Sequence, residues 1–327
     1  IISATIVQAA FYVILTAHTF KESVNWSYLR EWLKASPINL YSIVGNRIAT
    51  FTLILLFMYG ELARGYYQAA ITVAGIVGYS TFLTFALYPK LLSKIDIDDI
   101  STSFRMILMF AIPMTVGSIV LSDSYLAILS SPDKDYTGAG FVLTVLAIST
   151  LVASISQIFY TIIVGVEEID AKAKIPFKQL MKTRLFQVFT LPYFQSVIAL
   201  PTTFFALFYI AKTQLEAVTY FAYISLIVQL IMLLCTFVLA RRCVSFSFPW
   251  KSMMKYVLAS TIMVAVLIIL PHPERLLQTV GITMLGALIY FVIMLTIDHE
   301  TREMARSVMN VVTSWLGKGK SEKVNEG

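Results

Sequence analysis

Residues 37–90 read PINLYSIVGNRIATFTLILLFMYGELARGYYQAAITVAGIVGYSTFLTFALYPK, two long apolar runs joined by a six-residue polar turn from Gly60 to Gly65. Each run has about the 20 residues that a helix needs to cross the ~30 Å hydrocarbon core of a bilayer. Arg47 lies inside the first run, only twelve residues before the turn. Because twelve residues make about 18 Å of helix, we expect the span to begin before Arg47 and to hold this cation inside the membrane.

The composition extends this pattern to the whole chain. Hydrophobic residues make up 58% of the 327 residues and charged residues 13%, whereas soluble domains carry about 25% charged residues. The mean hydropathy is +0.78. We therefore predict an all-α, polytopic membrane protein with about nine transmembrane helices. The expected spans are Ile1–His18, Pro37–Tyr59, Tyr66–Tyr88, Phe104–Leu121, Gly138–Val164, Leu185–Ala211, Val218–Leu239, Met253–Leu270 and Leu277–Ile297.

The basic residues alternate between the predicted connections. Every second connection carries a single one, namely Arg64, Lys134, Lys212 or Arg275. The other connections and the tail hold twenty, and Arg47 completes the total of 25. Because Lys and Arg accumulate in cytoplasmic loops, we expect a multi-pass protein of the cell membrane with a cytoplasmic C-terminus. Residue 1 would then lie on the outer side, which implies an odd number of earlier spans.

The first basic connection, residues 19–36, alternates aromatic and aliphatic residues with charged ones. This pattern predicts an amphipathic helix in the membrane interface. Ser36 followed by Pro37 is typical of an N-cap and first helical position, so we expect a new helix to begin there. The connection is either a tether or a lateral gate.

Polar residues inside the spans are the candidate functional residues. Arg47, with Asn46 beside it and Tyr41 before it, either lines a water-filled cavity or extends its guanidinium to the headgroups. In span Leu185–Ala211, the amides Gln187 and Gln195 flank one proline.

Prolines are the second signal. Pro192 and Pro201 lie in one span and Pro113 in another. Each removes a helix hydrogen bond and is expected to kink its helix, which transporters use where helices line a cavity. Prolines are also simply more frequent in membrane helices than in soluble ones.

Motifs for catalysis or metal binding do not occur. The three His residues lie at different span ends, the two Cys residues form no CxxC pair, and no HExxH, GxSxG or phosphate loop appears. All nineteen acidic residues fall in connections, span ends or the tail. We therefore expect no enzyme activity, no cofactor, no metal site, no nucleic-acid partner and no intramembrane proton relay.

Two segments carry a family resemblance. Gly65, Tyr66, Tyr67 and Ala69, followed by a Tyr-Pro-Lys close at residues 88–90, resemble the polysaccharide and lipid-linked oligosaccharide flippases of the multidrug/oligosaccharidyl-lipid/polysaccharide exporter superfamily. The loop SSPDKDYTGAGFVLTVLAIST, at residues 130–150, is similar to an outer loop of the same family.

The resemblance implies a fourteen-helix, two-lobe fold of which this chain holds the last nine helices. Residues 1–18 would be the last helix of an N-terminal lobe and 19–36 the cytoplasmic linker. Residues 37–240 would be a six-helix C-lobe, 241–297 two additional helices, and 298–327 a cytoplasmic tail. It further implies a transporter that flips a polyprenyl-phosphate- or pyrophosphate-linked glycan to the outer leaflet by alternating access.

The same resemblance suggests roles for particular residues. Arg47 would attract the anionic headgroup, while Tyr66, Tyr67 and the span with two prolines would shape the outer mouth. Besides the glycan and membrane lipids, the partners would be the N-terminal lobe or other glycan-assembly proteins. The alternatives are a cation-coupled multidrug exporter of the same superfamily and a truncated, non-transporting assembly partner.

Overall fold

The computed structural model describes residues 6–8, 10–13, 26–86, 97–131, 134–166, 183–271, 273, 275–303 and 306. The described part of the chain is helical and contains no strand. Its elements are α2 (Trp26–Phe57), α3 (Glu61–Gly78), the 3-10 helix η2 (Tyr79–Ala86), α5 (Ile97–Val120), α6 (Ser122–Leu129), the 3-10 turn η3 (Thr137–Ala139), α7 (Gly140–Val166), α9 (Arg184–Phe205), the π-helix η5 (Ala206–Ile210), α10 (Gln214–Cys243), α11 (Trp250–Ile269) and α12 (Leu276–Ile297).

Seven helices in the described residues are long and apolar enough to cross a membrane, so the chain is an all-α, multi-pass membrane protein. The seven segments are Asn39–Phe57, Asp99–Val120, Thr137–Val166, Arg184–Ile210, Gln214–Cys243, Trp250–Ile269 and Leu276–Ile297.

This count differs from the nine expected spans. The predicted span Ile1–His18 lies mostly outside the described residues. Within it the structure describes only residues 6–8 and 10–13, which are helical. The predicted span Tyr66–Tyr88 lies in α3 and η2 and is not among the seven. Its helix begins earlier than expected, and the first two turns carry Glu61, Arg64 and Gln68, which lower the hydropathy of the helix.

The prediction that Ser36 and Pro37 begin a new helix is wrong. The backbone of α2 is continuous from Trp26 to Phe57 and passes through both residues. A proline in a helix interior removes one backbone hydrogen bond, but the apolar run on its C-terminal side continues the helix. The helical backbone from Trp26 onward agrees with a helical linker before the span.

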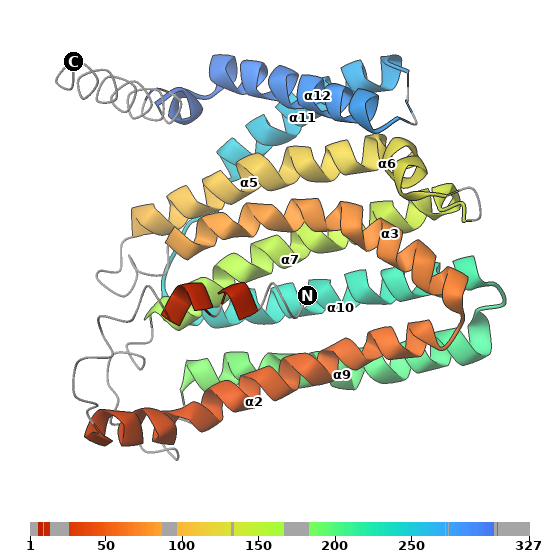
Figure 1. Cartoon of the computed structure of the whole chain (residues 1–327). Coiled ribbons are helices and arrows are strands. Elements are labelled where there is room, and N and C mark those ends of the chain that lie inside the picture. The colour runs from red at the N-terminus through yellow and green to blue at the C-terminus, as the bar shows by residue number, and fades with distance from the viewer. Residues whose placement is uncertain are drawn as a thin grey trace, which may run out of the picture.

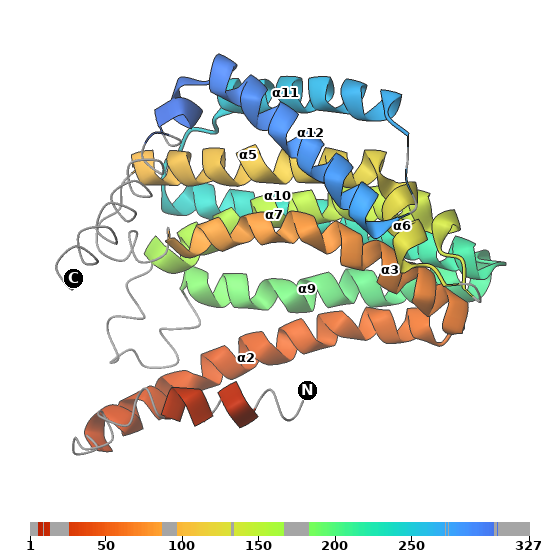
Figure 2. The ribbon, with the colours of Figure 1, turned by 45° about the horizontal axis from the view of Figure 1, so that its top comes forward.

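Consecutive long helices run in opposite directions, so the helix ends gather at two ends of the bundle (Figures 1 and 2). At one end lie the connections that carry Arg64, Lys134 and Lys212 as their single basic residues, and we call it the basic-poor end. These three connections contact one another. Lys134 pairs with Glu61 at 2.6 Å, and the Tyr59 hydroxyl donates to the Ala211 carbonyl at 2.7 Å. Gly60 turns the chain there with φ +141°, and a side chain at this position would collide with Gln214.

The opposite, basic-rich end is tied by ion pairs. Lys255 of α11 contacts Asp298, which follows α12, at 2.9 Å, and Arg105 of α5 contacts Glu300. The Asp298 carboxylate also accepts hydrogen bonds from the backbone and hydroxyl of Thr301. These contacts hold the end of α12 against α5 and α11.

The helices pack in three groups, visible in Figures 1 and 2. α7 is central and packs against α3, α5 and α10. α2 packs mainly against α9 on one side of the bundle, and the α11–α12 hairpin packs against α5 on the other. This arrangement leaves much of α2 exposed, since only 11% of its apolar segment is buried within the chain.

A proline explains one buried contact between the hairpin and α5. Pro113 lies inside α5 and has no N–H for the carbonyl of Met109, four residues earlier. The Tyr290 hydroxyl of α12 donates to this carbonyl at 2.7 Å. The hydrogen bond that the proline removes is thus replaced by one from a neighbouring helix.

Candidate functional site

The seam between α2 and α9 is aromatic. Tyr41 stacks between Phe186 and Tyr193, with ring centroids 5.2 and 4.5 Å away. The Tyr41 hydroxyl donates to Thr190 Oγ1 at 3.2 Å, and the Tyr193 hydroxyl donates to the Tyr41 carbonyl at 2.7 Å. Gly45 permits this approach, because a Cβ there would lie 2.5 Å from the Tyr193 ring. Tyr41 therefore positions α2 against α9.

Next to this seam lies a cavity of about 400 Å³ among α2, α7, α9 and α10, which we call the interior cavity. All four helices are among the seven membrane-spanning candidates. Its lining residues are Ser42, Asn46, Ala153, Ser156, Gln157, Tyr160, Val188, Leu191, Pro192, Gln195, Gln229, Met232 and Thr236. The lining contains four amide side chains and four hydroxyl side chains, and no lining residue is charged.

Three of the amides are free. Gln157, Gln195 and Gln229 come from three different helices, and within the described residues none of their side chains has a hydrogen-bond partner. The fourth, Asn46, donates to the Ser42 carbonyl on its own helix at 3.0 Å. Unpaired amides are costly in hydrocarbon, so these side chains favour contact with water or with a polar ligand.

A buried hydroxyl adds to the free groups. Ser156 is 8% exposed, and its Oγ has no hydrogen-bond partner in the described part of the chain. By contrast, the Thr236 hydroxyl bonds carbonyls of its own helix. The unsatisfied serine and the three glutamines together form a set of donors and acceptors available to a bound molecule.

The structure brings some of the predicted residues to this cavity and not others. Asn46, Gln195 and Pro192 line it. Arg47 is exposed on α2, and Gln187 is exposed on α9, and neither belongs to the lining. Arg47 is adjacent to Asn46 in the chain, so its charge is carried by the same turn of α2, where both residues are exposed.

The prolines of α9 do not interrupt the helix. α9 continues through Pro192 and Pro201 and ends in the π-helix η5. Ser196 donates its hydroxyl hydrogen to the Pro192 carbonyl at 2.7 Å. Pro192 therefore contributes to the cavity as a lining residue.

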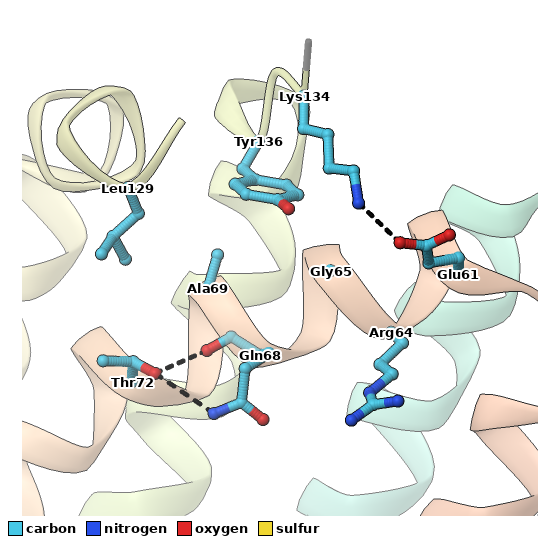
Figure 3. A pocket seen from close by; sticks show the side chains of 9 residues that line it. All are labelled: Glu61, Arg64, Gly65, Gln68, Ala69, Thr72, Leu129, Lys134 and Tyr136. Carbon is cyan, nitrogen blue, oxygen red and sulfur yellow. Dashed lines mark hydrogen bonds and ion pairs between the residues drawn. The ribbon is translucent and has the colours of Figure 1, made fainter. Parts of the chain in front are cut away.

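A second hollow, the end pocket, lies at the basic-poor end and has a volume of about 340 Å³. Figure 3 shows its lining residues, which come from α3, from the last residue of α6 and from the segment between α6 and α7. They are Glu61, Arg64, Gly65, Gln68, Ala69, Thr72, Leu129, Lys134 and Tyr136. Unlike the interior cavity, this pocket carries charged side chains.

The end pocket is lined by parts of both segments that resemble the flippases, residues 65–72 of the first and Lys134 and Tyr136 of the second. The Tyr136 ring covers Gly65 closely, because a Cβ there would lie 2.7 Å from it. Tyr66 meets the same ring edge-to-face at a centroid distance of 6.1 Å. Tyr67 points elsewhere and packs edge-to-face on Phe221 of α10 at 5.3 Å. The two tyrosines predicted for the outer mouth thus lie at the basic-poor end and are partly buried.

Comparison with protein-family models, curated proteins and solved structures finds no match to this chain. The candidate sites therefore depend on the residues themselves. Sequence reasoning missed Ser156, Gln157 and Gln229, although glutamines inside long apolar runs were a visible signal. It also missed the end pocket, since the contact between residues 61–72 and 129–136 is not local in the chain.

Proposed function

We propose that the chain is the cavity-forming part of a membrane transporter that moves a lipid-linked oligosaccharide or polysaccharide precursor between leaflets by alternating access. The ligand would carry a polyprenyl phosphate or pyrophosphate, and the chain would work with a second bundle or other glycan-assembly proteins. The resemblance of residues 65–90 and 130–150 to glycan flippases supports this reading.

The observation that carries the proposal is the interior cavity. Its free groups are amides and hydroxyls, each of which both donates and accepts hydrogen bonds. Sugars present many hydroxyl groups with the same dual character and no charge. An uncharged polar cavity among membrane-spanning helices is therefore chemically suited to the glycan part of such a ligand.

The anionic carrier would use a different group. Arg47 is exposed on α2, one residue from the cavity-lining Asn46. A guanidinium binds phosphate oxygens through two parallel hydrogen bonds. In the proposal, Arg47 attracts the phosphate while the adjacent cavity receives the sugars.

The two alternatives make different demands on the cavity. A cation-coupled exporter needs carboxylates in the membrane, and no lining residue of the interior cavity is acidic. An assembly partner without transport activity needs no cavity at all, and the free glutamines would then be an unexplained cost.

The experiment compares two glutamines of the same helix. Gln195→Leu removes an amide from the interior cavity, and Gln187→Leu removes an exposed amide outside it. Binding of a lipid-linked glycan to the purified chain in lipid nanodiscs should weaken about tenfold in the first variant, which corresponds to one lost hydrogen-bond site. The second variant should bind as the unmodified chain does.

Two outcomes would contradict the proposal. One is equal binding by the Gln195→Leu and Gln187→Leu proteins. The other is equal affinity for the polyprenyl phosphate with and without its glycan, because the interior cavity would then add nothing to recognition.

A further inference from the structure

The end pocket is separate from the interior cavity. Along α7, Gly140 marks the basic-poor end, and the cavity residue Ser156 follows sixteen residues later. This separation is about 24 Å of helix. The two hollows therefore lie in different halves of the bundle and cannot hold the same small group.

One face of α3 supplies most of the end pocket. Glu61, Arg64, Gln68 and Thr72 recur at spacings of three and four residues, so they share a face of the helix. The alanines and valines of the opposite face are buried in the bundle. The polar lining residues of α3 therefore form one exposed face of an amphipathic helix.

The pocket is preorganised by contacts across its rim. The Lys134–Glu61 ion pair joins the two segments at 2.6 Å, and the Tyr136 ring lies over Gly65. Lys134 also lowers the pKa of the Glu61 carboxyl through its hydrogen bond and charge. Glu61 therefore stays ionised near neutral pH, and its charge offsets that of Lys134.

This compensation leaves Arg64 as the excess positive charge of the pocket. Its guanidinium lies over the Phe57 ring at 5.0 Å and donates no hydrogen bond to any described residue. In Figure 3 the Arg64 side chain points away from the Lys134–Glu61 pair, toward the side where the Gln68 amide extends. Its planar donors are free for a ligand.

We propose that the end pocket binds an anionic saccharide, a sugar that carries a carboxylate or phosphate group. Arg64 pairs with the oxyanion through two parallel hydrogen bonds. The Gln68 amide nitrogen donates to Thr72 Oγ1 at 3.4 Å, and the Thr72 hydroxyl donates to the Gln68 backbone carbonyl at 2.7 Å. The Gln68 amide oxygen therefore accepts a hydrogen bond from a sugar hydroxyl, and the Tyr136 ring offers an apolar surface to the C–H face of the sugar. This site requires no transport step, so it goes beyond the function proposed above.

The test measures binding to the full chain in phosphatidylcholine nanodiscs by calorimetry. The probes are glucuronate, glucose 1-phosphate, glucose and inorganic phosphate. At least one of the two anionic sugars should bind about tenfold more tightly than both glucose and inorganic phosphate, because only it engages Arg64 and the neutral groups together. Which of the two binds identifies the oxyanion as carboxylate or phosphate.

Variants locate the site. Arg64→Gln should weaken binding of the anionic sugar about tenfold or more, and Arg64→Lys should restore part of it. Gln68→Leu should also weaken binding of the anionic sugar. It replaces Arg64→Gln as the test if the Arg64→Gln protein does not fold. Lys212→Gln is the matched control, because Lys212 lies at the same end but outside the pocket.

Three results would overturn the proposal. Inorganic phosphate could bind as tightly as the tighter-binding of the two anionic sugars, which indicates a simple anion or headgroup site. Lys212→Gln could weaken binding as much as Arg64→Gln, which indicates general electrostatics. Gln195→Leu could abolish the binding while Arg64→Gln leaves it intact, which places the sugar in the interior cavity. If the protein did not transport a glycan, the proposal that the end pocket binds an anionic saccharide would still stand, because its test measures binding alone.

Discussion

Replacing Tyr290 by phenylalanine should destabilise the contact between α12 and α5. The ring stays and only the hydroxyl is lost, which leaves the Met109 carbonyl without its donor. Tyr290 is 1% exposed and Met109 3% exposed, so water does not replace the bond. An unsatisfied buried acceptor costs about 1–3 kcal/mol, and hydrogen bonds between membrane helices average about 0.6 kcal/mol. We therefore expect a loss near 1 kcal/mol.

The reasoning depends on Pro113, so a double-mutant cycle tests it. Pro113→Ala supplies an N–H that reaches the Met109 carbonyl within the helix. In this background Tyr290→Phe should cost less than about half as much as it does alone, because the carbonyl keeps a partner. The assay is thermal unfolding in detergent, where 1 kcal/mol corresponds to a shift of about 2 °C.

A second tyrosine provides the control. The Tyr125 hydroxyl of α6 bonds Thr283 of α12 at 2.7 Å, and no proline-freed carbonyl is involved. Tyr125→Phe should cost the same with and without Pro113→Ala. Equal costs of Tyr290→Phe in the two backgrounds would refute the argument that the tyrosine replaces the bond removed by the proline.

Three other changes give independent tests. Arg47→Ala should abolish most glycan transport at normal abundance and Arg47→Lys should keep part of it, because an ammonium supplies charge but no planar fork; near-normal export by the alanine variant would show that Arg47 merely extends to the headgroups. Burial acts to raise the pKa of Asp298, but hydrogen bonds from Lys255 and Thr301 outweigh it and lower the net pKa, so the ion pair stabilises the fold above pH ~4 and this stability is lost as the pH falls through the lowered pKa. Asp298→Asn should therefore unfold at a lower temperature than the unmodified chain at pH 7, with the gap narrowing as the pH falls below ~4 and closing below the lowered pKa of Asp298. Cysteine introduced at Lys212 should react with an impermeant thiol reagent from outside intact cells, and cysteine at Ser245 should not; the reverse pattern would invert the predicted orientation.

The sequence predicted the class of fold because hydropathy and charge act locally. Apolar runs of sufficient length and the alternation of basic residues were readable without tertiary contacts, and the described helices alternate in direction as expected. The helix boundary at Pro37 was predicted wrongly, because the local capping signal competes with the long apolar run that continues α2. A local capping signal predicts a helix boundary poorly where the residues on both sides favour a continuous helix.

The candidate sites were only partly predictable for a physical reason. Asn46 and Gln195 drew attention because polar groups are costly in a membrane, and both line the interior cavity. Tyr41 was expected to add polarity to a cavity, yet its hydroxyl bonds Thr190 and its ring is stacked. Tertiary packing determines which face of a helix contacts which neighbour. The residues of α2 and α9 that contact each other are separated by about half of the chain, so a local sequence pattern does not predict this contact.

That separation has a consequence for biosynthesis. The hydrogen bond between Tyr41 and Thr190 joins residues 149 positions apart, and ribosomes add about 5–20 residues per second. Roughly 7–30 s therefore pass between synthesis of Tyr41 in α2 and synthesis of Thr190 in α9, its main packing partner. During this time α2, which carries Arg47 and Asn46, has few helices to pack against. A factor that shelters polar helices in the membrane during this interval would favour formation of the contact between α2 and α9.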